Sequence, residues 1–191
     1  MADDLPVLAF SDAATWERWL AERDAAAPGV WLKIAKKGSG IPTVTYSEAL
    51  DVALCHGWID GQKGSFDTAY FLQRFTPRRP GSRWSKINVD RVAALTAAGR
   101  MAPAGLRQVE LAQADGRWET AYDGQRSASV PPDLVTALAA NPVAQAFFDG
   151  LTGANRYAIL YRVGEAKRPA TRAARIEKYV AMLAEGKSIH G

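Results

Sequence analysis

Two kinds of hydrophobic periodicity divide this chain, and together they limit the folds that it can adopt. Apolar residues alternate with a period of two, as in strands, only before residue 80, in the segments 30–35 and 66–76. After Asn88 the apolar residues recur at spacings of three and four, as in helices. We therefore predict an α+β fold, with a small antiparallel sheet in the N-terminal half packed with helices and an all-helical C-terminal half.

Local signals place the elements of the N-terminal half. Ser11 or Asp12 can cap a first helix. Thr45 and Glu48 have the spacing of a capping box, which predicts a second helix whose apolar face continues to Trp58. The glycines of residues 61–64 predict a turn after this helix.

A polar stretch at residues 123–131 is the best candidate for an internal linker. It divides the chain into an α+β region over residues 1–122 and a helical region over residues 123–191. We expect the second region to pack on the first as one compact unit.

The composition excludes several classes of protein. The single cysteine rules out an internal disulfide framework and fits a reducing compartment. With one cysteine and two histidines, the chain lacks the ligands of a structural zinc site, so we expect no metal and no cofactor. No apolar run approaches the ~18 residues of a membrane span, and the acidic N-terminus lacks a signal-peptide pattern. These features predict a cytoplasmic protein without membrane insertion.

A basic segment is the strongest candidate for a binding site. Between residues 74 and 91 six basic side chains accompany a single acidic one, Asp90. Arginine offers a rigid fork of donors that matches carboxylate and phosphate and also stacks on aromatic rings. The predicted ligand-binding residues are Asp60, Arg74, Arg78, Arg79 and Trp84, with Lys33 and Lys86 in support. The alternative is a structural loop, in which Arg74 pairs with a carboxylate, Arg78 and Arg79 are solvated, and Trp84 belongs to the core.

Asp60, Cys55 and His56 are the residues to consider for chemistry near this segment. Asp60 can orient an arginine of the pocket or accept hydrogen bonds from backbone donors in a turn. Cys55 and His56 are neighbours on the predicted helix and point about 100° apart, so they do not form a catalytic dyad. Cys55 has the character of a small buried apolar residue. We predict no catalytic residue.

Several motifs resemble those of the YdeI/OmpD-associated family, also called bacteriocin-protection proteins. They are residues 53–55 with 57–61, 74–80, 82, 84–85, 88, 99–101 with 103–105, and 116–118, followed by 166–167, 171–172, 175–178 and 186–187. His56 departs from the pattern, where an aromatic residue is expected. The resemblance implies a bacterial protein tied to tolerance of bacteriocins and antimicrobial peptides, with an N-terminal half like the YjbR/CyaY-like α+β group. It implies no catalytic residues.

The leading functional hypothesis is a non-enzymatic stress-tolerance protein that binds a small anionic ligand or an acidic protein surface at the basic segment. A second hypothesis is an enzyme that acts on a small acidic or peptide substrate in the same pocket, with Asp60 or His56 as proton carrier. A third is nucleic-acid binding through the basic loop and the arginines of the last helix, Arg172 and Arg175. The net charge of only +4 argues against avid binding of long polyanions.

Overall fold

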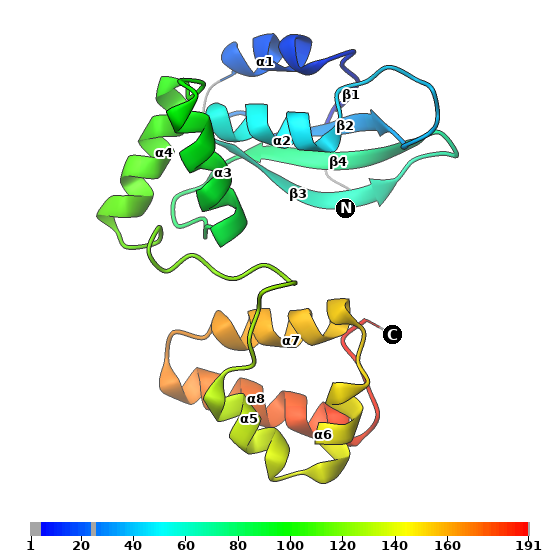
Figure 1. The fold of residues 1–191 in the computed structure, drawn as a ribbon, viewed down its shortest axis with the longest axis vertical. Helices are drawn as coiled ribbons and strands as arrows, with labels where there is room; N and C mark the ends of the chain where they lie inside the picture. Colours follow the sequence, from blue (N-terminus) through cyan, green and yellow to red (C-terminus); the bar gives the residue numbers. More distant parts are fainter. Residues whose placement is uncertain (1–4, 24–25, 191) are drawn as a thin grey trace. The chain divides into compact units, whose positions relative to one another are not determined.

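The computed structural model describes residues 5–23 and 26–190, and the chain forms two compact units, residues 1–121 and 122–191 (Figure 1). Unit 1 holds a four-stranded sheet and four helices among its described residues, and unit 2 holds four helices. The predicted α+β fold class, with the sheet in the N-terminal half, is confirmed. No described helix combines the length and the apolar character that crossing a bilayer requires.

The sheet has the strand order β1-β2-β4-β3. Its strands are β1 (Val7–Leu8), β2 (Val30–Ala35), β3 (Trp58–Ser65) and β4 (Tyr70–Pro77). Strands β2, β4 and β3 pair antiparallel, as predicted, while the short β1 adds a parallel edge beside β2.

Helices α1 (Ala13–Ala21) and α2 (Tyr46–Cys55) cover one face of this sheet (Figure 1). The Asp12 carboxylate accepts a hydrogen bond from the Thr15 amide and so caps α1. Thr45 and Glu48 form the predicted capping box at the start of α2. Trp16 and Phe75 meet in the core below these helices, with their ring centroids 5.6 Å apart.

The segment after α2 differs from the sequence prediction. The helix ends at Cys55, and Gly57, with φ of +76°, turns the chain directly into β3. The predicted turn at residues 61–64 is wrong, because these residues lie within β3. The register shifts between Asp60 and Lys63, where a bulge takes up one extra residue. The buried amide of Gln73 donates to the carbonyls of Gly61 and Gln62 and so stabilises the bulge.

Alternation along β2 and β4 separates the two faces of the sheet. Leu32 and Phe75 point to the helix-covered face and are fully buried. Trp31 and Arg74 are Cα partners on the opposite face and are partly exposed. We call this opposite side the open face, because the described helices of unit 1 pack on the other side (Figure 1).

Helices α3 (Lys86–Ala97) and α4 (Pro103–Ala114) complete unit 1 beside α2. Two close backbone contacts fix α4 against the end of α2. The Ala102 amide donates to the Cys55 carbonyl at 3.1 Å. A Cβ atom on Gly105 would lie 2.2 Å from the same carbonyl oxygen, so only glycine fits there.

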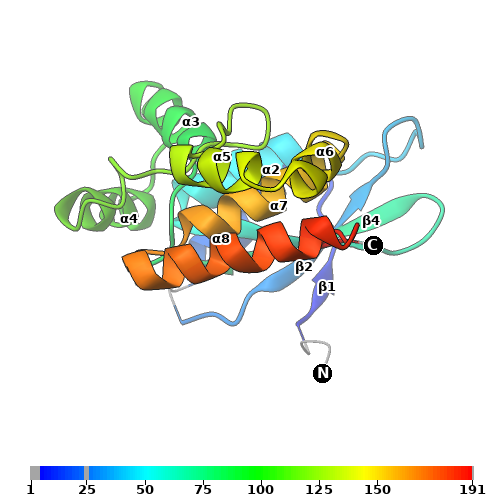
Figure 2. The same cartoon turned by 90° about the horizontal axis from the view of Figure 1, so that it is seen from below.

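Unit 2 is a four-helix structure with its own hydrophobic core, and the predicted helical character of this region is confirmed. Helix α8 packs against each of the other three helices, as Figure 2 shows. Leu134, Phe148, Ile159 and Leu183 are among the buried core residues. The helices are α5 (Pro132–Ala139), α6 (Pro142–Asp149), α7 (Gly153–Gly164) and α8 (Pro169–Ala184).

Candidate functional site

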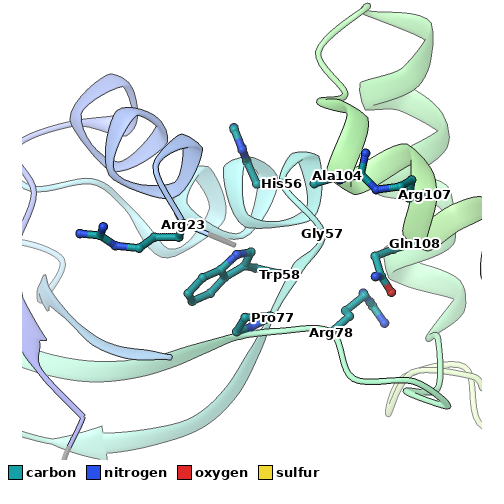
Figure 3. A pocket seen from close by; sticks show the side chains of 9 residues that line it. All are labelled: Arg23, His56, Gly57, Trp58, Pro77, Arg78, Ala104, Arg107 and Gln108. Carbon is teal, nitrogen blue, oxygen red and sulfur yellow. The ribbon is translucent and has the colours of Figure 1, made fainter. Parts of the chain in front are cut away.

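Unit 1 contains a small pocket rich in arginine (Figure 3). It lies where the end of α2, the start of β3, the end of β4 and the first turns of α4 meet. Its volume is about 170 Å³. We call it the arginine pocket, and its lining residues are Arg23, His56, Gly57, Trp58, Pro77, Arg78, Ala104, Arg107 and Gln108.

Backbone contacts between these elements hold the walls of the arginine pocket in place. The Arg78 amide donates to the Gly57 carbonyl at 3.0 Å, which joins the end of β4 to the start of β3. A side chain at Gly57 would collide with the Ala104 carbonyl oxygen, 2.9 Å from the position of its Cβ. The site therefore depends on three segments that are far apart in the sequence.

Arg78 forms the buried wall of the arginine pocket. It is only 4 % exposed, and its guanidinium stacks on Trp84, with Cζ 3.5 Å from the ring centroid. Its Nη1 donates to the Arg83 carbonyl. Trp84 in turn packs on Trp118 inside the core, so the aromatic partner of Arg78 is itself fixed. Figure 3 shows Arg78 and Gln108 pointing toward one another.

The rim of the arginine pocket adds further positive charge. Arg23 and Arg107 are exposed side chains at its edge. His56 lies 3.7 Å from the Glu17 carboxylate, measured from Nε2 to Oε1. None of the described residues that line the arginine pocket is acidic. A pocket lined by charges of one sign attracts ions of the opposite sign, so this lining favours an anion.

The seven residues predicted as a binding site occupy five different places. Arg78 and Trp84 are brought together by their stack, and Arg78 alone of the seven lines the arginine pocket. Lys33 and Arg74 lie on the open face of the sheet. Arg79 and Lys86 are exposed, the first in the turn that its amide closes with Ser82, the second at the start of α3.

Asp60 lies on the helix-covered face, opposite to Arg74, because its Cα partner is Phe75. Its carboxylate accepts a hydrogen bond of 2.7 Å from the Tyr46 hydroxyl. Burial raises the pKa of Tyr46, and the bond to Asp60 raises it further. Tyr46 therefore stays protonated and donates to Asp60 across the physiological range.

Sequence reasoning did not select Arg23, Arg107 or Gln108. The sequence does hold a pattern that groups Arg107 and Gln108. They lie three and four residues after Ala104, so all three share one face of α4. That face has no obvious partner in the sequence. Only the docking of α4 on the end of α2 brings it to Arg78.

Cys55, the last residue of α2, is buried next to the arginine pocket residue His56. Burial raises the pKa of the Cys55 thiol, which keeps it protonated and unreactive. No group of three or more potential metal ligands occurs among the described residues.

Unit 2 carries a separate groove between α5 and α8, with a volume of about 680 Å³. Its floor is apolar and includes Ile176 and Val180.

The arginines of α8 have partners. At the edge of this groove Arg172 donates two hydrogen bonds of 2.5 and 2.9 Å to the Asp133 carboxylate. Arg175 donates to the Arg162 carbonyl and lies 3.7 Å from Glu165. The basic side chains of α8 that were candidates for nucleic-acid contact thus have partners within unit 2.

The fold and the arginine pocket define a protein of two units, an α+β unit with an anion-suited pocket and a helical unit. Residues 8–108, which are 101 of the 191 residues, match a family described as a domain of unknown function (DUF8412), and the chain belongs to this family. All residues that line the arginine pocket fall within that range.

Residues 127–186 match a second family, described as bacteriocin-protection, YdeI or OmpD-associated. This match confirms the family resemblance for the C-terminal part of the chain. The motifs of residues 53–105 lie instead in the part that matches the domain of unknown function. The likeness of the N-terminal half to the YjbR/CyaY-like group stays a prediction. No curated protein and no solved structure matches the chain.

Proposed function

We propose that this protein is a non-enzymatic binding protein that holds a small anionic group in the arginine pocket. The observation that carries the proposal is the nearly buried guanidinium of Arg78 in the wall of a pocket whose rim adds Arg23 and Arg107. The match of residues 127–186 supports a role in tolerance of bacteriocins. The cytoplasm as the place of this role is part of the proposal.

The size of the arginine pocket limits the ligand. At about 170 Å³ it is smaller than the ~300–1,000 Å³ typical of sites for drug-sized molecules. It has room for one carboxylate, phosphate or sulfate group. The ligand is therefore either a small oxyanion or the anionic end of a larger molecule, which includes a carboxylate on an acidic partner protein.

A thermal-shift titration tests this proposal. Phosphate, sulfate, citrate and acetylated dipeptides with a free carboxylate are each added to the full chain. A ligand at a hundred times its Kd stabilises the folded state by about 2.7 kcal/mol. For a chain of this length we expect the melting temperature to rise by roughly 5–10 °C.

Two variants locate the effect in the arginine pocket. Arg107→Gln removes an exposed rim charge without disturbing the core and should abolish most of the shift. Arg126→Gln removes an exposed arginine of unit 2 and serves as the matched control, which should keep the full shift. If no anion stabilises the wild-type chain, or if Arg107→Gln and Arg126→Gln respond alike, the proposal is wrong.

A further inference from the structure

The open face of the sheet in unit 1 combines aromatic side chains with cations. Trp31 and Tyr70 project from β2 and β4 on this face, and Phe66 lies just beyond the end of β3. Phe66 is 48 % exposed, and Val7 beside Trp31 is 46 % exposed. The main hydrophobic core of unit 1 lies on the other side of the sheet.

Two glycines of β3 leave room for the side chains of the open face. The indole of Trp31 reaches across β4, and its Cζ3 lies 4.0 Å from where a Cβ of Gly64 would be. The aliphatic part of Arg74 lies over Gly61, with Cβ, Cγ and Cδ within 3.8 Å of the equivalent position. The Trp31 ring and the aliphatic part of Arg74 therefore each lie over a glycine of β3.

The charges of the open face have one sign. Lys33 and Arg74 occupy strand positions there, and none of the described strand positions on this face carries a carboxylate. The Lys33 ammonium lies 4.0 Å from the ring centroid of Tyr70 and 4.5 Å from that of Phe66. At one end of the face Asp67 accepts hydrogen bonds from the amides of Ala69 and Tyr70, and Lys36 donates to its carbonyl.

We propose that the open face binds single-stranded nucleic acid, with bases stacked on Trp31, Tyr70 and Phe66 and phosphates held by Lys33 and Arg74. Unstacked bases bind aromatic side chains through their π-faces whatever their sequence, and cations beside the rings neutralise the backbone. A four-stranded sheet with exposed aromatic residues has room for two or three bases.

The position of the cations favours a polyanion over a protein as the occupant. Lysine is depleted from protein interfaces, whereas arginine is enriched there, so the argument rests on Lys33. Lys33 lies in β2, one of the two central strands, where a protein partner would have to desolvate its ammonium. A phosphate backbone would meet both Lys33 and Arg74 with opposite charge.

Fluorescence anisotropy on the full chain tests the inference with a labelled oligo-dT and a labelled oligo-U of about ten nucleotides. Both strands should bind at low salt. Trp31→Ala should weaken binding roughly tenfold or more, whereas Tyr70→Phe, which keeps the ring, should bind like the wild type. Lys33→Ala should reduce the slope of log K against log salt by about 0.7, the contribution of one phosphate contact on a single strand.

Lys178→Ala removes an exposed lysine of α8 and is the matched control, for which we expect wild-type affinity and salt dependence. Circular dichroism confirms that each variant is folded. The inference is overturned if the wild type leaves the anisotropy unchanged at low salt, or if Trp31→Ala binds as tightly as the wild type. A third result would also overturn the inference. In it the wild type binds no oligonucleotide but forms a concentration-dependent dimer, and Trp31→Ala abolishes that dimer, so the open face is an interface between two copies of the chain.

Discussion

Arg78 shows how one side chain can depend on distant parts of a chain. Its charge lies against the Trp84 ring, which in turn rests on Trp118. Guanidinium groups stack on aromatic planes more readily than ammonium groups do, and they keep their charge when buried. Lysine at this position would therefore keep the sign of the charge but lose the planar contact that aims it into the arginine pocket.

Gly105 lies where helix α4 closely approaches the end of helix α2. Gly105→Ala places a Cβ about 2.2 Å from the Cys55 carbonyl oxygen, so α4 must move away from α2. Overpacking of this kind costs about 1–3 kcal/mol, which exceeds the gain of ~1 kcal/mol in helix propensity. A urea titration should show a lower midpoint and, because α4 carries Arg107, a weaker anion-induced shift in melting temperature.

Gly164→Ala is the control for this substitution. Gly164 is also a helical glycine, but no atom lies within 4 Å of the position of its Cβ. We expect this variant to be as stable as the wild type or up to ~1 kcal/mol more stable. Equal effects of the two substitutions would contradict the argument from packing.

At the scale of elements, helix α2 links two parts of unit 1. Its first residue, Tyr46, contacts Asp60, and its last residue, Cys55, is followed by His56 and Gly57 of the arginine pocket. Thr45 accepts from the Glu48 amide, and the Glu48 carboxylate accepts from the Thr45 amide at 2.9 Å. These hydrogen bonds satisfy donors that the first turn of a helix leaves free.

Thr45→Ala should destabilise the fold by about 1 kcal/mol, because the cap of α2 is lost. The measurement is the urea midpoint at unchanged m-value. Thr45→Ser keeps the hydroxyl and should recover most of the loss. A Thr45→Ser variant as unstable as Thr45→Ala would show that the methyl group, not the cap, matters.

At the scale of the whole molecule, the two family matches fall in different units, residues 8–108 in unit 1 and residues 127–186 in unit 2. Each unit has its own hydrophobic cluster. All six tryptophans belong to unit 1, so tryptophan fluorescence follows that unit while far-UV circular dichroism follows both.

The Asp133–Arg172 pair predicts how acid affects unit 2. The hydrogen bonds from Arg172 hold the pKa of Asp133 below its usual value of 3.8. A lowered folded-state pKa adds stability that is fully present above the unfolded-state value and is lost as the pH falls through the folded-state value. Asp133→Asn should therefore unfold more easily than the wild type at pH 7. The difference should shrink as the pH falls below the usual value of about 3.8 and should disappear once the pH is below the lowered folded-state pKa.

Circular dichroism melts between pH 2 and pH 7 measure this difference. Glu119→Gln removes an exposed carboxylate of unit 1 and controls for the change in net charge. A difference between Asp133→Asn and the wild type that is the same at all pH values would contradict the assigned role of the pair.

The sequence by itself determined most of the elements and their faces. Alternation gave β2 and the direction of the side chains in β4, and spacing with capping gave the helices, because these patterns depend on residues close together in the chain. The strand β3 was missed, since its glycines lie in an edge strand with a bulge, where the local signal is that of a turn.

Only the tertiary structure decided which charged residues share a site. Arg74 and Asp60 are both strand residues, yet the register of β3 against β4 puts them on opposite faces of the sheet. Arg107 reaches the arginine pocket because α4 docks on the end of α2, far away in sequence. Periodicity tells which side of an element a residue occupies, but what lies opposite that side depends on packing between elements, which no local pattern records.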